Sequence, residues 1–105
     1  MQSLIKLLDK NLKYINNEII EDTIIIKVES ERDFFQCPNC NNTSDKVHSR
    51  YLRSFQDLPI SGKKVIILLN NRKFLCKNSE CNKTTFAETF NFISSKSKKT
   101  KRLEE

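Results

Sequence analysis

Two closely spaced pairs of cysteines constrain the fold of this chain more than any other feature of its sequence. Two residues separate the first pair, four separate the second, and 35 residues lie between the pairs. Thiolates at such short spacing can bind one ion from a tight turn, whose backbone N–H groups offset the charge on the sulfurs. Two such turns match the four-sulfur, tetrahedral coordination of a structural Zn²⁺ site, which leaves no position open for catalysis. The spacing therefore predicts one structural zinc ion held by Cys37, Cys40, Cys76 and Cys81.

The cysteines could instead form a redox motif or remain unlinked thiols, and the single histidine could be a metal ligand. A redox Cys-x-x-Cys motif usually stands alone near a βαβ unit and would give the second pair no role. The paired spacing also favours zinc over four unlinked buried thiols. His48 could replace one cysteine as a ligand, but four sulfurs suffice and it lies in a predicted strand. We expect His48 at the surface or in contact with phosphate.

Composition and the N-terminal sequence exclude several classes of protein. The longest apolar run covers residues 65–69, far short of the roughly 18–20 residues that span a bilayer. Charged residues within the first ten positions argue against a secretory signal peptide, so we expect a cytoplasmic protein with reduced thiols. The single glycine excludes Gly-rich phosphate-binding loops. We expect neither a membrane nor a small-molecule substrate among the partners.

The positive charge is concentrated in the part of the chain that contains the cysteines. Residues 1–36 carry five basic and seven acidic side chains, for a net charge of −2. Residues 37–105 carry fourteen basic and six acidic side chains, for a net charge of +8. A field of this sign favours a polyanion as partner, most simply nucleic acid. A lysine-rich surface that serves only solubility is the alternative.

Hydrophobic periodicity predicts an N-terminal amphipathic helix. Over residues 2–15, Leu4, Leu8 and Leu12 recur at helical spacing, and Lys and Asp side chains occupy the opposite face. A helix of about three turns is expected here. Packing of its apolar face on the domain's own sheet is favoured over binding to a partner protein.

Extended segments account for most of the rest of the chain. Strands are expected over residues 19–29, 46–58, 63–69 and 84–90. The stretch 63–69 is almost wholly apolar, as in a central strand that is covered on both faces. Residues 59–62 contain a proline and the glycine and should form a turn. The sequence leaves open whether Asn70-Asn71 turns the chain or lies inside one long strand. The predicted fold is α+β, with a small antiparallel, zinc-ribbon-like sheet, the N-terminal helix and a disordered basic tail.

Composition divides the chain into three regions. Residues 1–36 are a lead-in of helix and strand, residues 37–93 the zinc-ribbon domain, and residues 94–105 a basic linker with the start of a further helix. Within the last region, SSKSKKTKR contains no apolar residue, so we expect it to be disordered. The final Leu103-Glu104-Glu105 looks like a helix that has only begun, which suggests a fragment of a longer protein.

Several short segments together point to a family. They are CPNC, KVHSRYLRSFQDLP, GKKVIILLNNRKFLC and, after the second cysteine pair, KTTFAETF. This stretch resembles the N-terminal zinc-ribbon module of insertion-sequence transposases of the ISL-three group, most strongly over residues 37–90. The four cysteines match the zinc ligands of that family. Its other motif positions are matched by Arg53, Asp57, Leu58, Pro59, Gly62, Phe86, Ala87 and Glu88. Asn41 departs from the family by replacing its usual glycine.

The resemblance implies a role in DNA transposition. It implies that the chain binds the terminal inverted repeats of a mobile element and that transposase subunits are further partners. In the family a helix-turn-helix region and a catalytic domain follow, and KTKRLEE resembles the beginning of the former. The catalytic domain needs carboxylates on a nuclease-like fold to hold two metal ions, and the remaining residues cannot form that fold. We therefore expect a truncated product that is not itself an enzyme and is nucleoid-associated when bound to DNA.

Basic residues near the cysteines and in the tail are the predicted DNA contacts. The candidates are Lys46, His48, Arg50, Arg53, Arg72, Lys73, Lys77, Lys83, Lys96, Lys98, Lys99, Lys101 and Arg102. Each could instead be a solvated surface residue, and Arg53 could pair internally with Asp57. Without a recognition helix, base-specific readout should be weak.

Two rival functions stay open at this point. An interaction module would leave the helix face of Leu4, Leu8 and Leu12 exposed in the monomer for transposase subunits. An enzyme that acts through its thiols would need an accessible cysteine of low pKa.

Overall fold

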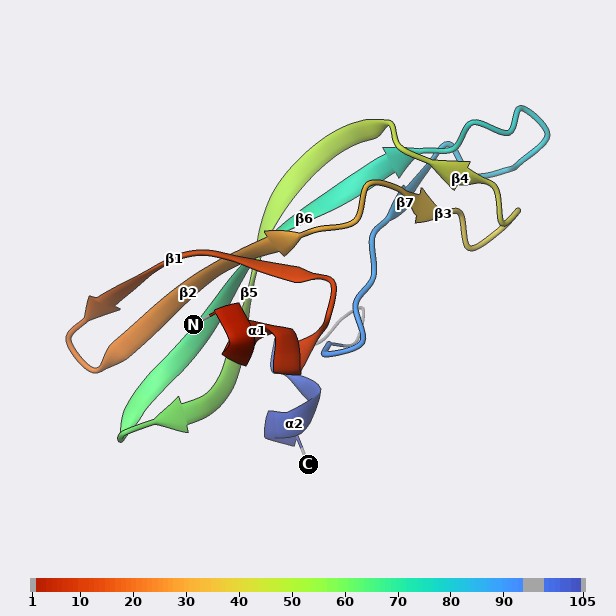
Figure 1. Cartoon of the computed structure of the whole chain (residues 1–105). Coiled ribbons are helices and arrows are strands. Elements are labelled where there is room, and N and C mark those ends of the chain that lie inside the picture. Colours follow the sequence, from red (N-terminus) through yellow and green to blue (C-terminus); the bar gives the residue numbers. More distant parts are fainter. Residues whose placement is uncertain (1, 94–97, 105) are drawn as a thin grey trace.

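Strands dominate the structure, a computed structural model that describes residues 2–93 and 98–104 (Figure 1). The elements are α1 (Gln2–Leu8), β1 (Leu12–Ile20), β2 (Thr23–Ser30), β3 (Phe35–Gln36), β4 (Thr43–Ser44), β5 (Val47–Ile60), β6 (Lys63–Leu75), β7 (Thr85–Ala87) and α2 (Lys101–Glu104). A large sheet has the strand order β1-β2-β6-β5, with β7 also paired to β6, and β3 and β4 form a separate ribbon. The β-rich, zinc-ribbon-like part of the predicted fold agrees with this, whereas the helical part is small. No helix among the described residues is long and apolar enough to cross a membrane.

The N-terminal helix ends at Leu8, so the prediction of a helix over residues 2–15 was wrong for its second half. The Asp9 carboxylate accepts a hydrogen bond from the backbone N–H of Asn11 at 2.9 Å, and this local turn competes with helix continuation. Leu12 then begins a strand, in which it is fully buried. Ile5 and Leu8 pack against the core of the sheet, as expected for a helix that covers its own domain.

A hairpin divides the stretch that was predicted as one strand over residues 19–29. β1 pairs antiparallel with β2, and Ile20 lies opposite Thr23. Glu21 between them has a φ of 54°, a left-handed conformation that closes the turn. The two consecutive acidic residues that break the apolar alternation were the sequence signal for this turn.

The large sheet is not purely antiparallel, which corrects the predicted topology. β2 runs parallel to β6, with Ile24 opposite Val65 and Val28 opposite Leu69. β5 and β6 form a long antiparallel hairpin whose turn contains Ser61 and Gly62, as predicted for residues 59–62. Because β5 already occupies one edge of β6, β2 can join only at the other edge.

β6 is the central strand of the molecule. Its residues Val65, Ile67 and Leu69 are buried and define the inner face of the sheet. Ile66 and Leu68 lie on the opposite, outer face and are only half-buried, so the expected cover on both faces is present on one. The strand continues through the Asn70-Asn71 pair without a turn. The main core consists of Ile5, Leu12, Ile26, Val28, Phe55, Val65, Ile67, Leu69, Phe90, Phe92 and Ile93.

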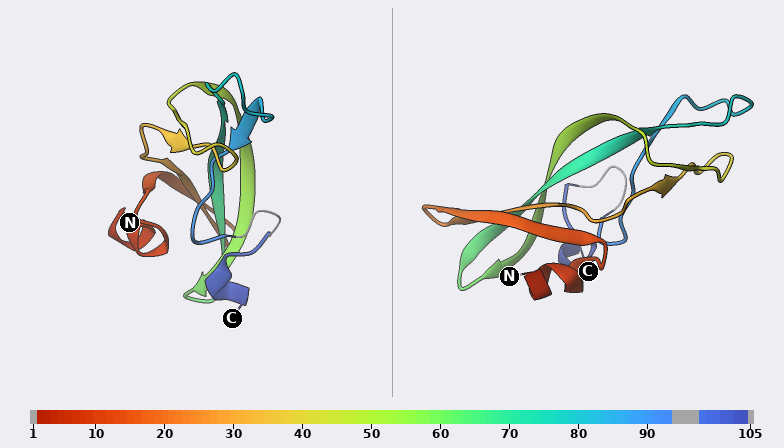
Figure 2. Two further views of the ribbon diagram at one scale, coloured as in Figure 1. Left: turned by 90° about the vertical axis from the view of Figure 1, so that its right-hand side faces the viewer. Right: turned by 45° about the horizontal axis from the view of Figure 1, so that its top comes forward.

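The molecule is elongated, with extents of 51 × 26 × 21 Å, and the loops that follow β3 and β6 lie at one end of it (Figure 2). These two loops contain the four cysteines. There the far end of β6 pairs with β7, and the β3–β4 ribbon lies beside it. A second, smaller core is formed by Cys37, Phe74 and Phe86. Since β1 and β2 share a sheet with β5 and β6, residues before and after the first cysteine belong to one structural unit.

Residues 98–100 of the basic tail are attached to β5, so the expected disorder is wrong for them. Residues 94–97 of the same segment lie outside the described residues. The backbone N–H of Gln56 donates to the carbonyl oxygen of Lys98 at 2.9 Å, and that of Thr100 donates to the carbonyl of Gln56 at 3.0 Å. The buried Thr100 hydroxyl also donates to the Asp57 carboxylate at 2.7 Å. The free edge of β5 offers unpaired backbone groups that even a segment without apolar side chains can bind.

Candidate metal centre

The first cysteine pair lies in a tight loop between β3 and β4, which we call the first knuckle (residues 37–42). The backbone N–H of Cys37 donates to the carbonyl of Asn42 at 2.9 Å, and that of Asn41 donates to the carbonyl of Cys37 at 2.8 Å. Asn41 has a φ of 64°, so it adopts the left-handed conformation for which Asn is the best substitute for Gly.

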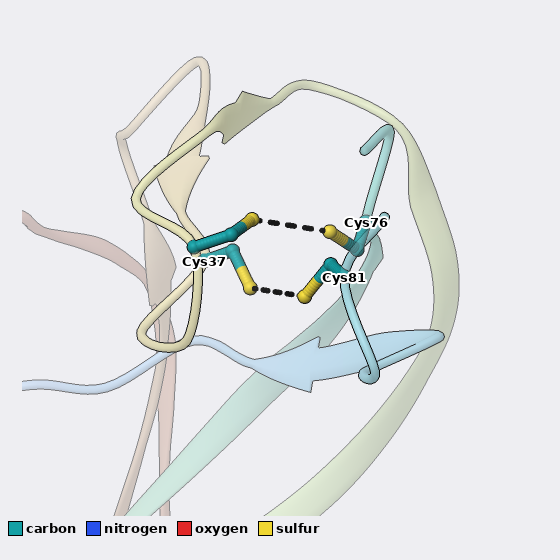
Figure 3. Close-up of side chains that lie close together, drawn as sticks. Cys37, Cys76 and Cys81 are labelled. Carbon is teal, nitrogen blue, oxygen red and sulfur yellow. Dashed lines mark hydrogen bonds between the residues drawn. The ribbon is translucent and has the colours of Figure 1, made fainter. Parts of the chain in front are cut away.

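The second pair lies in the loop that follows β6, which we call the second knuckle (residues 76–81). Cys76 directly follows the last residue of β6, and its backbone N–H donates to the carbonyl of Thr84 at 2.9 Å. The backbone N–H of Cys81 donates to the carbonyl of Asn78 at 3.1 Å. These bonds fold the loop back toward β7, so both sulfurs lie on the side of the first knuckle (Figure 3).

The two knuckles bring all four sulfurs together. The four Sγ atoms lie within 4.8 Å of one another, with 3.9 Å between Cys37 and Cys81 and 3.6 Å between Cys40 and Cys76. Zinc–sulfur bonds of about 2.3 Å in a tetrahedron place the sulfurs roughly 3.8 Å apart. The four sulfurs therefore lie close enough together to be ligands of one tetrahedral metal ion.

The electrostatics of the cluster also favour a bound cation. The Asn39 amide donates to Cys81 Sγ at 3.3 Å and lowers the pKa of that thiol to about 6. Burial raises the pKa of Cys37, but backbone N–H groups of its knuckle donate to the sulfur and bring the pKa below its ordinary value. The N–H of Asn78 lowers the pKa of Cys76, yet burial and the other sulfurs raise it to about 12. Four crowded sulfurs thus cannot all ionise on their own, whereas a coordinated cation deprotonates them together.

Aromatic side chains connect this centre with the sheet. The rings of Phe74 and Phe86 stack with their centroids 5.9 Å apart, and the Phe35 ring packs against both. Cys40, Cys76 and Cys81 are partly buried against the same small core.

His48 lies outside the cluster of sulfurs. Its side chain is exposed, and its Nδ1 lies 3.2 Å from the hydroxyl of Ser49. Among the described residues, the group that can hold a metal contains the four cysteines and no histidine.

The predicted DNA contacts differ in their surroundings. Lys77 is exposed and pairs with Asp45 at 2.6 Å. Arg53 is half-buried, and its guanidinium lies 3.5 Å from the Asn71 amide oxygen. The remaining candidates with exposed side chains are Lys46, Arg50, Lys73, Lys83, Lys98, Lys99 and Lys101. Lys96 and the side chain of Arg102 lie outside the part of the chain that the structure describes.

Arg72 is engaged inside the protein, in an ion cluster that sequence reasoning missed. Its Nε lies 3.0 Å from a carboxylate oxygen of Glu88, which is fully buried. Arg32 contacts the other oxygen of Glu88 at 3.2 Å, and the hydroxyl of Ser30 donates to the same oxygen. The cluster connects β2, β6 and the segment after β7 next to the second core. The acidic residue after Phe86-Ala87 was the one sequence signal for it.

Comparison with protein families gives a match for this part of the chain. Residues 33–81, which contain both knuckles, match the family described as the zinc-finger of transposase IS204/IS1001/IS1096/IS1165. No significant match was found among curated proteins or solved structures.

Proposed function

We propose that the chain is a zinc-dependent DNA-binding module, because residues 33–81 match the zinc-finger family of transposases. The proposed metal is one Zn²⁺ ion held by Cys37, Cys40, Cys76 and Cys81. Four sulfur donors at tetrahedral spacing and the family support this choice of ion. With four protein ligands the ion has no open position, so its role is to fix the two knuckles relative to each other.

The observation that carries DNA binding is which charged side chains residues 37–93 bury and which they expose. Of the four acidic residues within 37–93, Asp57 and Glu88 are buried, and Asp45 and Glu80 are exposed. The basic residues of the same stretch mostly keep their charge at the surface. Residues 37–93 therefore present a more positive surface than their net charge indicates, and such a surface attracts phosphates.

The proposed target follows from the family. We propose that the DNA is the terminal inverted repeat of a mobile element and that the module itself performs no chemistry. Phosphate contacts from Arg50, Lys46 and Lys73 would orient the module, while base readout would need a further element. Lys98, Lys99 and Lys101, which the β5 edge holds near the sheet, would add sequence-independent affinity.

Binding across a salt series tests this function. The zinc-loaded chain should bind a labelled DNA duplex with a steep negative dependence of log K on log salt concentration. Arg50→Gln should reduce that slope by about 1, since one phosphate contact is lost. Lys13→Gln, which removes an exposed charge from β1 in the acidic half of the chain, should leave the slope unchanged. Failure to bind any duplex at low salt would contradict the proposal.

Assembly with transposase subunits is the second candidate. The outer face of the sheet favours it, because Leu52 is 67% exposed beside the half-buried Leu68 and the exposed Ile15. The helix face that was first considered for this role is less suitable, since Ile5 and Leu8 pack on the main core. Light scattering separates the cases, because a strictly monomeric chain counts against self-assembly.

A further inference from the structure

A pocket of about 230 Å³ opens beside β5, between the metal centre and the main core. Its walls combine three kinds of surface: the Tyr51 ring, the Arg53 side chain and the segment that leaves β7. The lining residues are Tyr51, Arg53, Ala87, Glu88, Thr89, Phe90 and Ile93. Tyr51 and Arg53 lie opposite Asn71 and Leu69 of β6, which places them on the inner face of the sheet.

Tyr51 gives this pocket an aromatic surface that solvent can reach. The side chain is 36% exposed, whereas the next aromatic residue on the same face, Phe55, is buried in the main core. Packing in the main core accounts for an aromatic residue at position 55. Tyr51, by contrast, is not buried in a core and lines the pocket.

One cation lies against the Tyr51 ring, and a second lines the same pocket. The Nζ of Lys73 lies 5.8 Å from the centroid of that ring, and Arg53, two residues further along β5, is a lining residue. The guanidinium of Arg53 lies 4.8 Å from the Phe55 centroid, a contact that limits the freedom of its side chain. An aromatic ring with two cations nearby suits a ligand that has both a flat ring and a negative charge.

The acidic residue in the pocket wall does not oppose an anion. The Glu88 carboxylate is fully buried and faces the guanidinium groups of Arg72 and Arg32. One negative charge against two positive charges leaves this wall net positive. Ala87, Phe90 and Ile93 supply apolar surface to the rest of the lining.

We propose that this pocket binds one unpaired nucleotide of DNA, whose base stacks on Tyr51 and whose phosphates contact Lys73 and Arg53. The inference rests on the proposed DNA-binding function and specifies a site for it. A base inside a duplex cannot enter the pocket, so the module should prefer DNA in which a nucleotide is bulged or single-stranded. Base stacking on an aromatic side chain tolerates any base, which agrees with a module that lacks a recognition helix.

Equilibrium binding to two matched duplexes tests the site. One duplex is fully paired, and the other carries a single bulged 2-aminopurine, whose fluorescence reports stacking. The zinc-loaded chain should bind the bulged duplex about tenfold more tightly than the paired one and quench its fluorescence. Tyr51→Ala should abolish both effects while binding to the paired duplex persists, and Tyr51→Phe should retain both.

Phe34→Ala provides the matched control, because Phe34 is 58% exposed and lies outside the pocket lining. This variant should keep the preference for the bulged duplex. Equal affinity for the two duplexes, or an unchanged preference in Tyr51→Ala, would overturn the site while leaving DNA binding intact. Absence of binding to either duplex would overturn the proposed function and the site with it. Zinc content measured on each variant establishes that the substitution has not disrupted the knuckles.

Discussion

Glu88 shows how one residue can connect the metal centre with the rest of the protein. Its carboxylate is fully buried, and its partners Arg32 and Arg72 have side chains that are 19% and 12% exposed. The backbone N–H of Glu88 also donates to the carbonyl of Arg72 at 2.9 Å. Removal of one partner from such a group leaves buried charge without compensation, which destabilises a protein strongly.

Substitution Glu88→Gln tests this role. The amide is neutral and points N–H donors at two guanidinium groups, so the free energy of unfolding should fall by about 3 kcal/mol. Denaturant unfolding of the zinc-loaded chain measures this change. Asp45→Asn is the control, because Asp45 pairs with Lys77 at the exposed surface and its loss should leave stability nearly unchanged. Equal effects of the two substitutions would contradict the structural role of Glu88.

For individual residues, the sequence predicted the cysteine cluster correctly but did not predict the partner of each basic side chain. Cysteine spacing is a local signal, and the four sulfurs do lie together. An arginine has the same appearance in a sequence whether it faces a phosphate or a buried carboxylate. Arg72 was therefore placed among the DNA contacts, although its partner Glu88 lies 16 residues away and meets it only through the pairing of β6 with β7.

Among the elements, the β5–β6 hairpin depends most clearly on its turn. Ser61 and Gly62 have φ values of 52° and 77°, as in the two-residue turns that match the twist of a hairpin. A Cβ atom at Gly62 would meet nothing within 4 Å, so any effect of a substitution there comes from the backbone conformation.

Substitutions at the two positions of this turn should therefore differ in their effect on stability. Gly62→Ala should lower the free energy of unfolding by about 1 kcal/mol, because a residue with a Cβ atom is strained at this φ. Ser61→Asn should leave stability unchanged or raise it slightly, since Asn-Gly is the favoured pair for such turns. Thermal unfolding monitored by circular dichroism measures both. A neutral Gly62→Ala would show that the hairpin tolerates another turn.

The elements that sequence reasoning misjudged share a physical cause. Leu12 continues a helical spacing with Leu8 and also begins an alternation with Tyr14, so its local pattern fits both a helix and a strand. Its burial in the sheet decides between them. The parallel pairing of β2 with β6 could not be predicted from local sequence patterns either. It joins strands whose starts are 40 residues apart, and it depends on the whole fold.

Over the whole molecule, two cores lie along one long sheet. The main core consists of aliphatic and aromatic residues, whereas the smaller one contains three phenylalanines and the cysteines. Hydrophobic burial in the smaller core is modest, so the knuckle end should depend on the metal for its structure. The same end of the molecule contains the pairing of β7 with β6, and residues that follow β7 line the pocket.

The metal content of the purified chain tests this dependence most directly. Elemental analysis should find one zinc ion per chain, and EDTA should remove it and unfold the knuckle end, seen as a loss of near-ultraviolet circular dichroism from the phenylalanine cluster. Cys40→Ser should lose the ion, whereas His48→Ala should retain it. A chain that is purified without metal and keeps the same spectrum in EDTA would contradict the account.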